Sequence, residues 1–160
     1  MKKLLASVVV AVLLVTLLMS TVLAAPARDG RELILKGSIE ALETNSVNFP
    51  ILSVTASGLG HATQLGQFTV SYQVQVNLMT LAGITSAQFV AANGDSIYAS
   101  GTGQATPTGT PGVVTIIGNF TITGGTGRFE GASGTFTVDR VLDQTTGVTS
   151  GTISGTIMLP

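Results

Sequence analysis

The stretch from Gln67 to Leu78 alternates without a break between apolar and polar side chains. Its apolar positions are Phe68, Val70, Tyr72, Val74, Val76 and Leu78, and Thr, Ser, Gln and Asn fill the positions between them. Successive side chains of a β-strand point to opposite faces of the sheet, so this period of two predicts a strand with one dry and one wet face.

The same alternation recurs along the rest of the chain. Further strands are predicted at residues 33–42, 47–57, 84–92, 96–104, 113–123, 135–142 and 150–159. Pro50 indicates an edge position or a bulge in the second of these runs. The connections predict hairpins: a type I′ turn at Asn93-Gly94, a wider loop over Thr106–Gly112 and a tight reversal at Thr145–Gly147. No amphipathic helix pattern interrupts the series.

About eight closely spaced strands indicate an all-β sandwich or barrel. Only 9% of the residues are charged, so Lys side chains cannot protect open sheet edges, and closure removes those edges. Glycines inside the predicted strands allow the bends of a small barrel: Gly101, Gly103, Gly118, Gly151 and Gly155. We therefore predict a small closed or nearly closed antiparallel β-barrel of about eight strands, preceded by a signal-peptide helix. An outer-membrane barrel is the competing interpretation, but six Phe and two Tyr without paired belts disfavour it.

The first residues are typical of a secretory leader. Lys2 and Lys3 precede an apolar run from Leu4, and small residues at Val22 and Ala24 favour cleavage after Ala24. The predicted organisation is a signal peptide at residues 1–24, a short linker at 25–32 and a single barrel domain at 33–160. The leader has a bacterial character, which predicts a secreted protein, extracellular or periplasmic. If the leader stayed uncleaved, its length would suffice to anchor the chain in a membrane.

Composition excludes several classes of function. The chain has no Cys, which removes disulfides, thiolate catalysis and cysteine metal sites. The net charge is −1 and no basic patch is present, so no nucleic-acid partner is expected. His61, the only histidine, is expected at the surface in a turn or at the start of a strand, and no nucleophile elbow is present. The neighbouring acidic pairs Glu40/Glu43 and Asp139/Asp143 do not form a calcium loop. We expect no cofactor and no metal.

Residues 124–134, G-G-T-G-R-F-E-G-A-S-G, invite comparison with a phosphate-binding loop. The glycine spacing is one residue too long for a dinucleotide fingerprint, a predicted strand follows in place of a helix, and Glu130 would repel a phosphate. The stretch instead predicts a corner between two strands. Phe129 would fill an apolar pocket there, Arg128 and Glu130 would point into water, and the turn would be made by Gly124, Gly125, Gly127 and Gly131.

The segment Ile122–Gly134 resembles the GGTG-x-F-x-G-A-x-G segment of the allene oxide cyclase and dirigent barrels. Gly58–Thr69, G-L-G-H-A-T-Q-L-G-Q-F-T, also resembles a signature of uncharacterised bacterial secreted proteins that carry the same turn. The resemblance implies an eight-stranded antiparallel barrel with an apolar cavity, often assembled into a homo-oligomer. The activity is not implied as directly. Allene oxide cyclases use a Glu, an Asn and a Cys, and dirigent proteins have a basic residue where Glu130 follows Phe129.

A cavity would have walls built from the apolar strand faces, with Phe68, Tyr72, Phe120 and Phe136 as the candidate ligand-binding residues. The Tyr72 hydroxyl would be a polar handle; alternatively, these side chains simply fill the barrel. We expect a secreted barrel without evident catalytic machinery, structural or binding a small apolar ligand. The alternative is an allene oxide cyclase-like or dirigent-like isomerase or cyclase acting on an apolar substrate. It predicts a buried acid or base in the cavity, with candidates Glu40, Asp95 and Asp139.

Overall fold

The computed structural model describes residues 30–160. The predicted signal peptide and residues 25–29 of the predicted linker lie outside the described residues. The remaining chain forms eight strands: β1 Arg31–Asn48, β2 Ile51–Ala62, β3 Gly66–Asn77, β4 Ala82–Ala91, β5 Ser96–Pro107, β6 Val113–Gly125, β7 Ser133–Asp143 and β8 Val148–Leu159. One short 3₁₀ turn, η1 (Gly127–Phe129), lies between β6 and β7.

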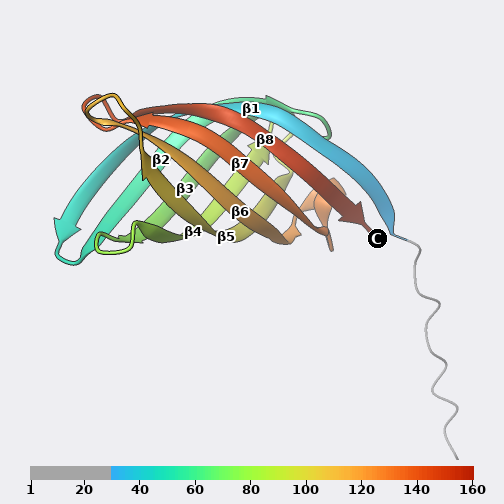
Figure 1. Cartoon of the computed structure of the whole chain (residues 1–160). Helices are drawn as coiled ribbons and strands as arrows, with labels where there is room; N and C mark the ends of the chain where they lie inside the picture. Colours follow the sequence, from blue (N-terminus) through green and yellow to red (C-terminus); the bar gives the residue numbers. More distant parts are fainter. Residues whose placement is uncertain (1–29) are drawn as a thin grey trace, which may run out of the picture.

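The strands close into one barrel in sequence order (Figure 1). Each strand pairs antiparallel with the next, and β8 returns to pair with β1 from Arg31↔Leu159 to Leu42↔Val148. The prediction of a closed eight-stranded antiparallel barrel is confirmed. The alternation of β3 gives the barrel a dry interior and a wet exterior, because Thr69, Ser71 and Gln73 are exposed while Val70 and Tyr72 are buried. This is the reverse of the apolar-outward alternation of outer-membrane barrels.

The first hairpin differs from the prediction at Pro50. Strand β1 continues to Asn48, and Phe49 and Pro50, joined by a cis peptide bond, form the turn to β2. Pro50 therefore occupies neither a bulge nor an edge position within a strand. The predicted strand ends at Leu42, before Glu43 interrupts the apolar inward positions, whereas the observed β1 continues to Asn48 and Glu43 is buried.

The predicted type I′ turn at Asn93-Gly94 is also wrong. Such a turn needs positive φ at both central residues, and only Gly94 has it, with φ of 89°. The Gly94 amide donates to the Ala91 carbonyl, and the Ala91 amide donates to the Asp95 carbonyl. This is the longer hairpin loop in which a left-handed glycine follows the turn. The Asn93 side chain bonds to Asp95, which favours this geometry.

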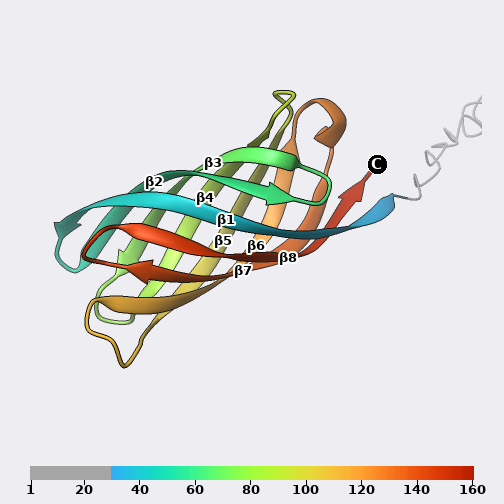
Figure 2. The same ribbon diagram turned by 90° about the horizontal axis from the view of Figure 1, so that it is seen from above.

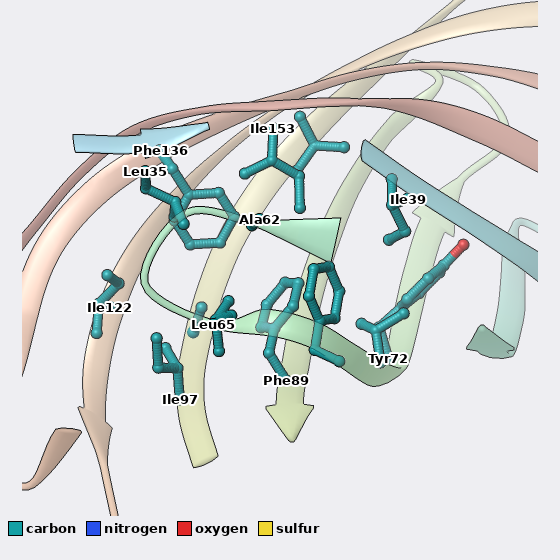
Figure 3. Packing of buried hydrophobic residues seen from close by; sticks show 14 of the residues in the cluster. Leu35, Ile39, Ala62, Leu65, Tyr72, Phe89, Ile97, Ile122, Phe136 and Ile153 are labelled. Carbon is teal, nitrogen blue, oxygen red and sulfur yellow. The ribbon is translucent and has the colours of Figure 1, made fainter. Parts of the chain in front are cut away.

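The barrel has two different ends. At the end where β1 begins and β8 finishes, η1 lies at the rim with Phe129 buried; we call this the plugged end (Figure 2). The turns β1–β2, β3–β4, β5–β6 and β7–β8 surround the opposite, open end. Phenylalanine rings pack inside the plugged half, where Phe89 meets Phe68 edge-on at 5.6 Å and Phe136 edge-on at 5.7 Å between ring centroids (Figure 3).

The glycine-rich corner forms the plug. Phe129 is 1% exposed, as the corner hypothesis requires. Gly127 has φ of 58°, and a Cβ there would overlap the Asp95 carboxylate. Arg128 does not simply point into water: its guanidinium lies 4.8 Å from the Phe129 ring centroid, and its Nε lies 3.8 Å from Asp95. Glu130 is exposed.

Three strand glycines each lie opposite an aromatic ring. A Cβ at any of them would overlap the opposing residue or its backbone, so the missing side chain makes room for the ring. The cross-strand pairs are Gly60↔Phe68, Gly101↔Phe120 and Gly155↔Phe136. Covering a strand glycine with a cross-strand ring is a known device for stabilising curved sheets. The glycines thus permit both bending and the burial of large rings.

Candidate functional site

A cavity of about 80 Å³ lies in the half of the barrel toward the open end. One water needs roughly 10–15 Å³ measured in the same way, so several waters or a small ligand fit. The wall is mostly apolar and includes Val74, Val76, Leu81, Ile116 and Val138. The barrel is therefore filled by side chains in its plugged half and hollow in its other half.

A row of three glycines makes this hollow. Gly83 on β4 pairs with Gly103 on β5, which in turn pairs with Gly118 on β6, and all three line the cavity. A Cβ at Gly103 would meet only ordinary contacts, the nearest at 3.6 Å. A side chain at Gly103 would fit without overlap, so packing does not explain its absence. A Cβ at Gly83 would lie 3.1 Å from Val74, and one at Gly118 would overlap the Phe120 ring at 2.7 Å, so Gly103 is the position of the row where packing does not require a glycine.

A buried polar cluster lies against the cavity. Tyr72 on β3 donates a hydrogen bond to Glu43 Oε1 on β1, with 2.7 Å between the oxygens. Arg140 on β7 forms an ion pair with the same Glu43 oxygen through Nη1. Nη1 also donates to Thr149 Oγ1 on β8 at 2.9 Å. The Arg140 guanidinium lies 5.4 Å from the Tyr72 ring centroid. Four strands thus contribute to one hydrogen-bonded cluster.

The strand register explains why these side chains meet. Glu43 pairs with Ala56 on β2, and Ala56 pairs with Tyr72 on β3, so all three lie in one row around the barrel. The small Ala56 side chain lets the Tyr72 hydroxyl reach across β2 to the carboxylate. On the other side, Arg140 pairs with Gly151, where a Cβ would overlap the Arg140 side chain. Small residues beside the cluster therefore make room for its long members.

Burial and charge keep the Tyr72 hydroxyl protonated. Burial raises the pKa of Tyr72 well above the usual phenol value, the Arg140 charge opposes this rise, and the negative charge and hydrogen bond of Glu43 add to it. The side chains of Arg140 and Glu43 are 13% and 6% exposed. The cluster therefore holds one cation, one anion and one neutral hydroxyl, and its net charge is zero.

The Arg140 guanidinium retains hydrogen-bonding capacity. Its bonds to Glu43, Tyr72 and Thr149 all come from Nη1. Within residues 30–160, no protein hydrogen bond is recorded for Nε or Nη2, and Arg140 lines the cavity. No buried side-chain nitrogen or oxygen of the described chain lacks a partner, so these atoms retain access to solvent or to the cavity. They are donors that the described chain does not use, on a side chain that lines the cavity.

The predicted ligand-binding residues divide into two groups. Tyr72 and Phe120 line the cavity, whereas Phe68 and Phe136 are buried in the core without contributing to its lining. Phe89, which the sequence reasoning did not select, also lines it.

The predicted acids do not enter the cavity. Glu40 and Asp139 are exposed, and Asp95 lies at the plugged end beside Arg128. His61 is exposed, as expected, but lies near the end of β2 and not in a turn or at the start of a strand. Among residues 30–160, no three His, Asp or Glu side chains come together to hold a metal.

Sequence reasoning missed Glu43 and Arg140, although a signal for both was present. Glu43 follows Ile39 and Ala41 at steps of two, and Arg140 follows Phe136 and Val138 in the same way. Both residues therefore occupy inward positions of strands whose other inward residues are apolar. An ionisable residue at such a position is a candidate for a buried role.

The open end carries apolar side chains and few charges. Phe49 in the β1–β2 turn is 70% exposed and Met79 in the β3–β4 turn is 72% exposed. Between Glu43 and Asp95 the chain has no Asp, Glu, Lys or Arg, and this segment supplies the two turns. Phe49 and Met79 are therefore exposed in two of the four turns at the open end, and these two turns carry no charge.

The fold and the site define a closed eight-stranded antiparallel barrel with an apolar cavity and a buried ion pair beside it. Comparison of the chain with models of known protein families, with curated proteins and with solved structures finds no match. Within the described chain, no helix has the length and hydropathy to cross a bilayer.

Proposed function

We propose that the protein is a secreted barrel that binds a small apolar ligand in the cavity of its open half. The observation that carries the proposal is the apolar cavity beside Gly103, because a Cβ would fit there without overlap and none is present. Close packing is the rule in protein interiors, and each missing side chain costs stability. A ligand in the cavity would restore the lost contacts. The cavity is small, so a ligand larger than a few carbon atoms must extend through the open end.

Filling the cavity tests this proposal. In Gly103→Leu, the new side chain enters the cavity from β5 and should abolish binding of a small apolar probe such as cyclohexanone, followed by ligand-observed NMR. Thr102→Leu is the matched control, because it adds the same side chain at the neighbouring exposed position. No binding by the unmodified protein, or equal binding by both variants, would contradict the proposal.

A second candidate is an isomerase or cyclase acting on an apolar substrate, in keeping with the resemblance to allene oxide cyclase and dirigent barrels. The observation that favours it is a buried carboxylate, Glu43, hydrogen-bonded to a hydroxyl that lines the cavity, that of Tyr72. A buried carboxylate beside a cavity is a candidate general base, and Tyr72, which donates to Glu43, would be a positioning residue for it. The test is whether a bound ligand is released with altered connectivity, and whether Tyr72→Phe stops the conversion without stopping binding. Release of unchanged ligand would remove this candidate.

A further inference from the structure

The charge state of the polar cluster limits which ligands the cavity accepts. The Arg140 cation is already compensated by Glu43, and both side chains are largely withdrawn from water. A ligand carboxylate beside Arg140 would be the second anion near one cation. Like charges in a buried site repel each other, and each buried ion also has a desolvation cost. The ion pair therefore disfavours an anionic ligand, although an arginine lines the cavity.

The hydrogen-bonding groups favour a particular neutral ligand. Arg140 Nε and Nη2 are donors without a recorded protein partner, and the Tyr72 hydroxyl has already directed its proton to Glu43. The cluster thus offers donors to an acceptor oxygen without requiring any charge from the ligand. The rest of the wall, including Val76, Leu81 and Ile116, is apolar.

We infer that the cavity is selective for neutral, mainly apolar ligands that carry one acceptor oxygen, such as a ketone or an alcohol, and that it discriminates against carboxylates. This inference rests on the proposed binding function. Arg140 holds the ligand oxygen, and Glu43 determines the selectivity by neutralising Arg140. The Tyr72 hydroxyl remains protonated and adds no negative charge.

A matched ligand series tests the selectivity. Cyclohexanone, cyclohexanol, cyclohexanecarboxylate and methylcyclohexane share one ring and differ only in the attached group. At neutral pH we expect the ketone and the alcohol to bind the purified protein at least about tenfold more tightly than the carboxylate, a difference of about 1.4 kcal/mol. They should also bind more tightly than methylcyclohexane. Dissociation constants come from ligand-observed NMR titrations.

The possible results distinguish the inference from the proposed function. A carboxylate that binds as tightly as the ketone would overturn the inference while leaving ligand binding intact. Equal binding of methylcyclohexane and cyclohexanone would also overturn it, because the cluster would then contribute nothing. If none of the four compounds binds, the proposed function fails as well.

A substitution at Glu43 tests the cause of the selectivity. Glu43→Gln removes the anion and leaves the Arg140 charge uncompensated, so the preference should shift toward the carboxylate by at least about tenfold. Glu40→Gln is the matched control, because Glu40 is exposed on the same strand. An unchanged preference in a folded Glu43→Gln protein would show that Glu43 does not set the selectivity. If that variant does not fold, the ligand series on the unmodified protein still decides the inference.

Discussion

Truncation of Phe129 tests the plugged end directly. The ring is 1% exposed and is held in a corner whose shape depends on Gly125, because a Cβ at Gly125 would overlap the Phe129 side chain and backbone. Replacing a buried Phe by Ala removes its transfer free energy and leaves a cavity, which together cost about 3–5 kcal/mol. The corner's own hydrogen bonds oppose a collapse that would refill the space: the Phe129 amide donates to the Thr126 carbonyl, and the Ala132 amide donates to the Phe129 carbonyl.

The measurement is thermal unfolding of Phe129→Ala followed by circular dichroism. For a domain of roughly 130 residues, this loss corresponds to a fall in Tm of roughly 10–20 °C. Arg128→Ala is the matched control in the same corner: its ion pair with Asp95 is at the surface, and surface pairs contribute about 1 kcal/mol or less. If Phe129→Ala destabilises no more than Arg128→Ala, the plug does not hold this end closed and the reasoning is refuted. Below its Tm, Phe129→Ala should still bind cyclohexanone, because Phe129 does not line the cavity.

Further predictions concern the cavity and the polar cluster. Gly103→Ala should raise the free energy of unfolding by roughly 0.5–1 kcal/mol in urea titrations, since Ala costs less than Gly in a strand and its Cβ fits. Gly101→Ala should lower it, because its Cβ would overlap the neighbouring strand. Arg140→Leu should cost about 3–5 kcal/mol by leaving the Glu43 carboxylate unpaired, and adding Glu43→Leu should recover most of that loss. The pKa of Tyr72 is raised in the folded state. The free energy of unfolding should therefore not depend on Tyr72 ionisation below the ordinary phenol pKa of about 10, and it should fall as pH rises above that value. Tyr72→Phe should remove that part of the fall, and an identical pH profile for both proteins would contradict the assignment.

Strand alternation predicted the strands, and the low charge and the strand glycines favoured a barrel over a sandwich. The predicted strand Gln67–Leu78 differs by one residue at each end from the observed β3, Gly66–Asn77. Period-two patterns are reliable where one face is dry, because a shift of one residue would move every apolar side chain into water. The first hairpin was less predictable, because its inward face ends in Glu43 and the apolar pattern stops there.

The polar cluster was harder to predict because it depends on register. The alternation of inward and outward residues places Glu43 and Arg140 on the inward face. It does not show that they meet, because they are 97 residues apart in sequence. Glu43 meets Arg140 only because β8 closes onto β1, and it meets Tyr72 only because Ala56 lies between them in the register. The sequence does not state these pairings. The strand glycines were predicted only to allow bends. That they also make room for aromatic rings depends on which residues lie opposite them, and this is known only from the strand register.

The inward residues change in size along the barrel, and this gradient explains why the cavity lies at one end. Successive strands run in opposite directions, so a gradient in space must reverse its order in sequence from one strand to the next. The three strands that contribute the glycine row show this reversal, each with a glycine toward the open end and a bulky residue toward the plugged end: Gly83 and Phe89 on β4, Ile97 and Gly103 on β5, Gly118 and Ile122 on β6. The order is kept through two reversals of direction, and packing does not require it at Gly103, where a Cβ would fit without overlap. Placing the bulky residues at the plugged end concentrates the stabilising burial there and leaves the open half free to hold a ligand beside Arg140.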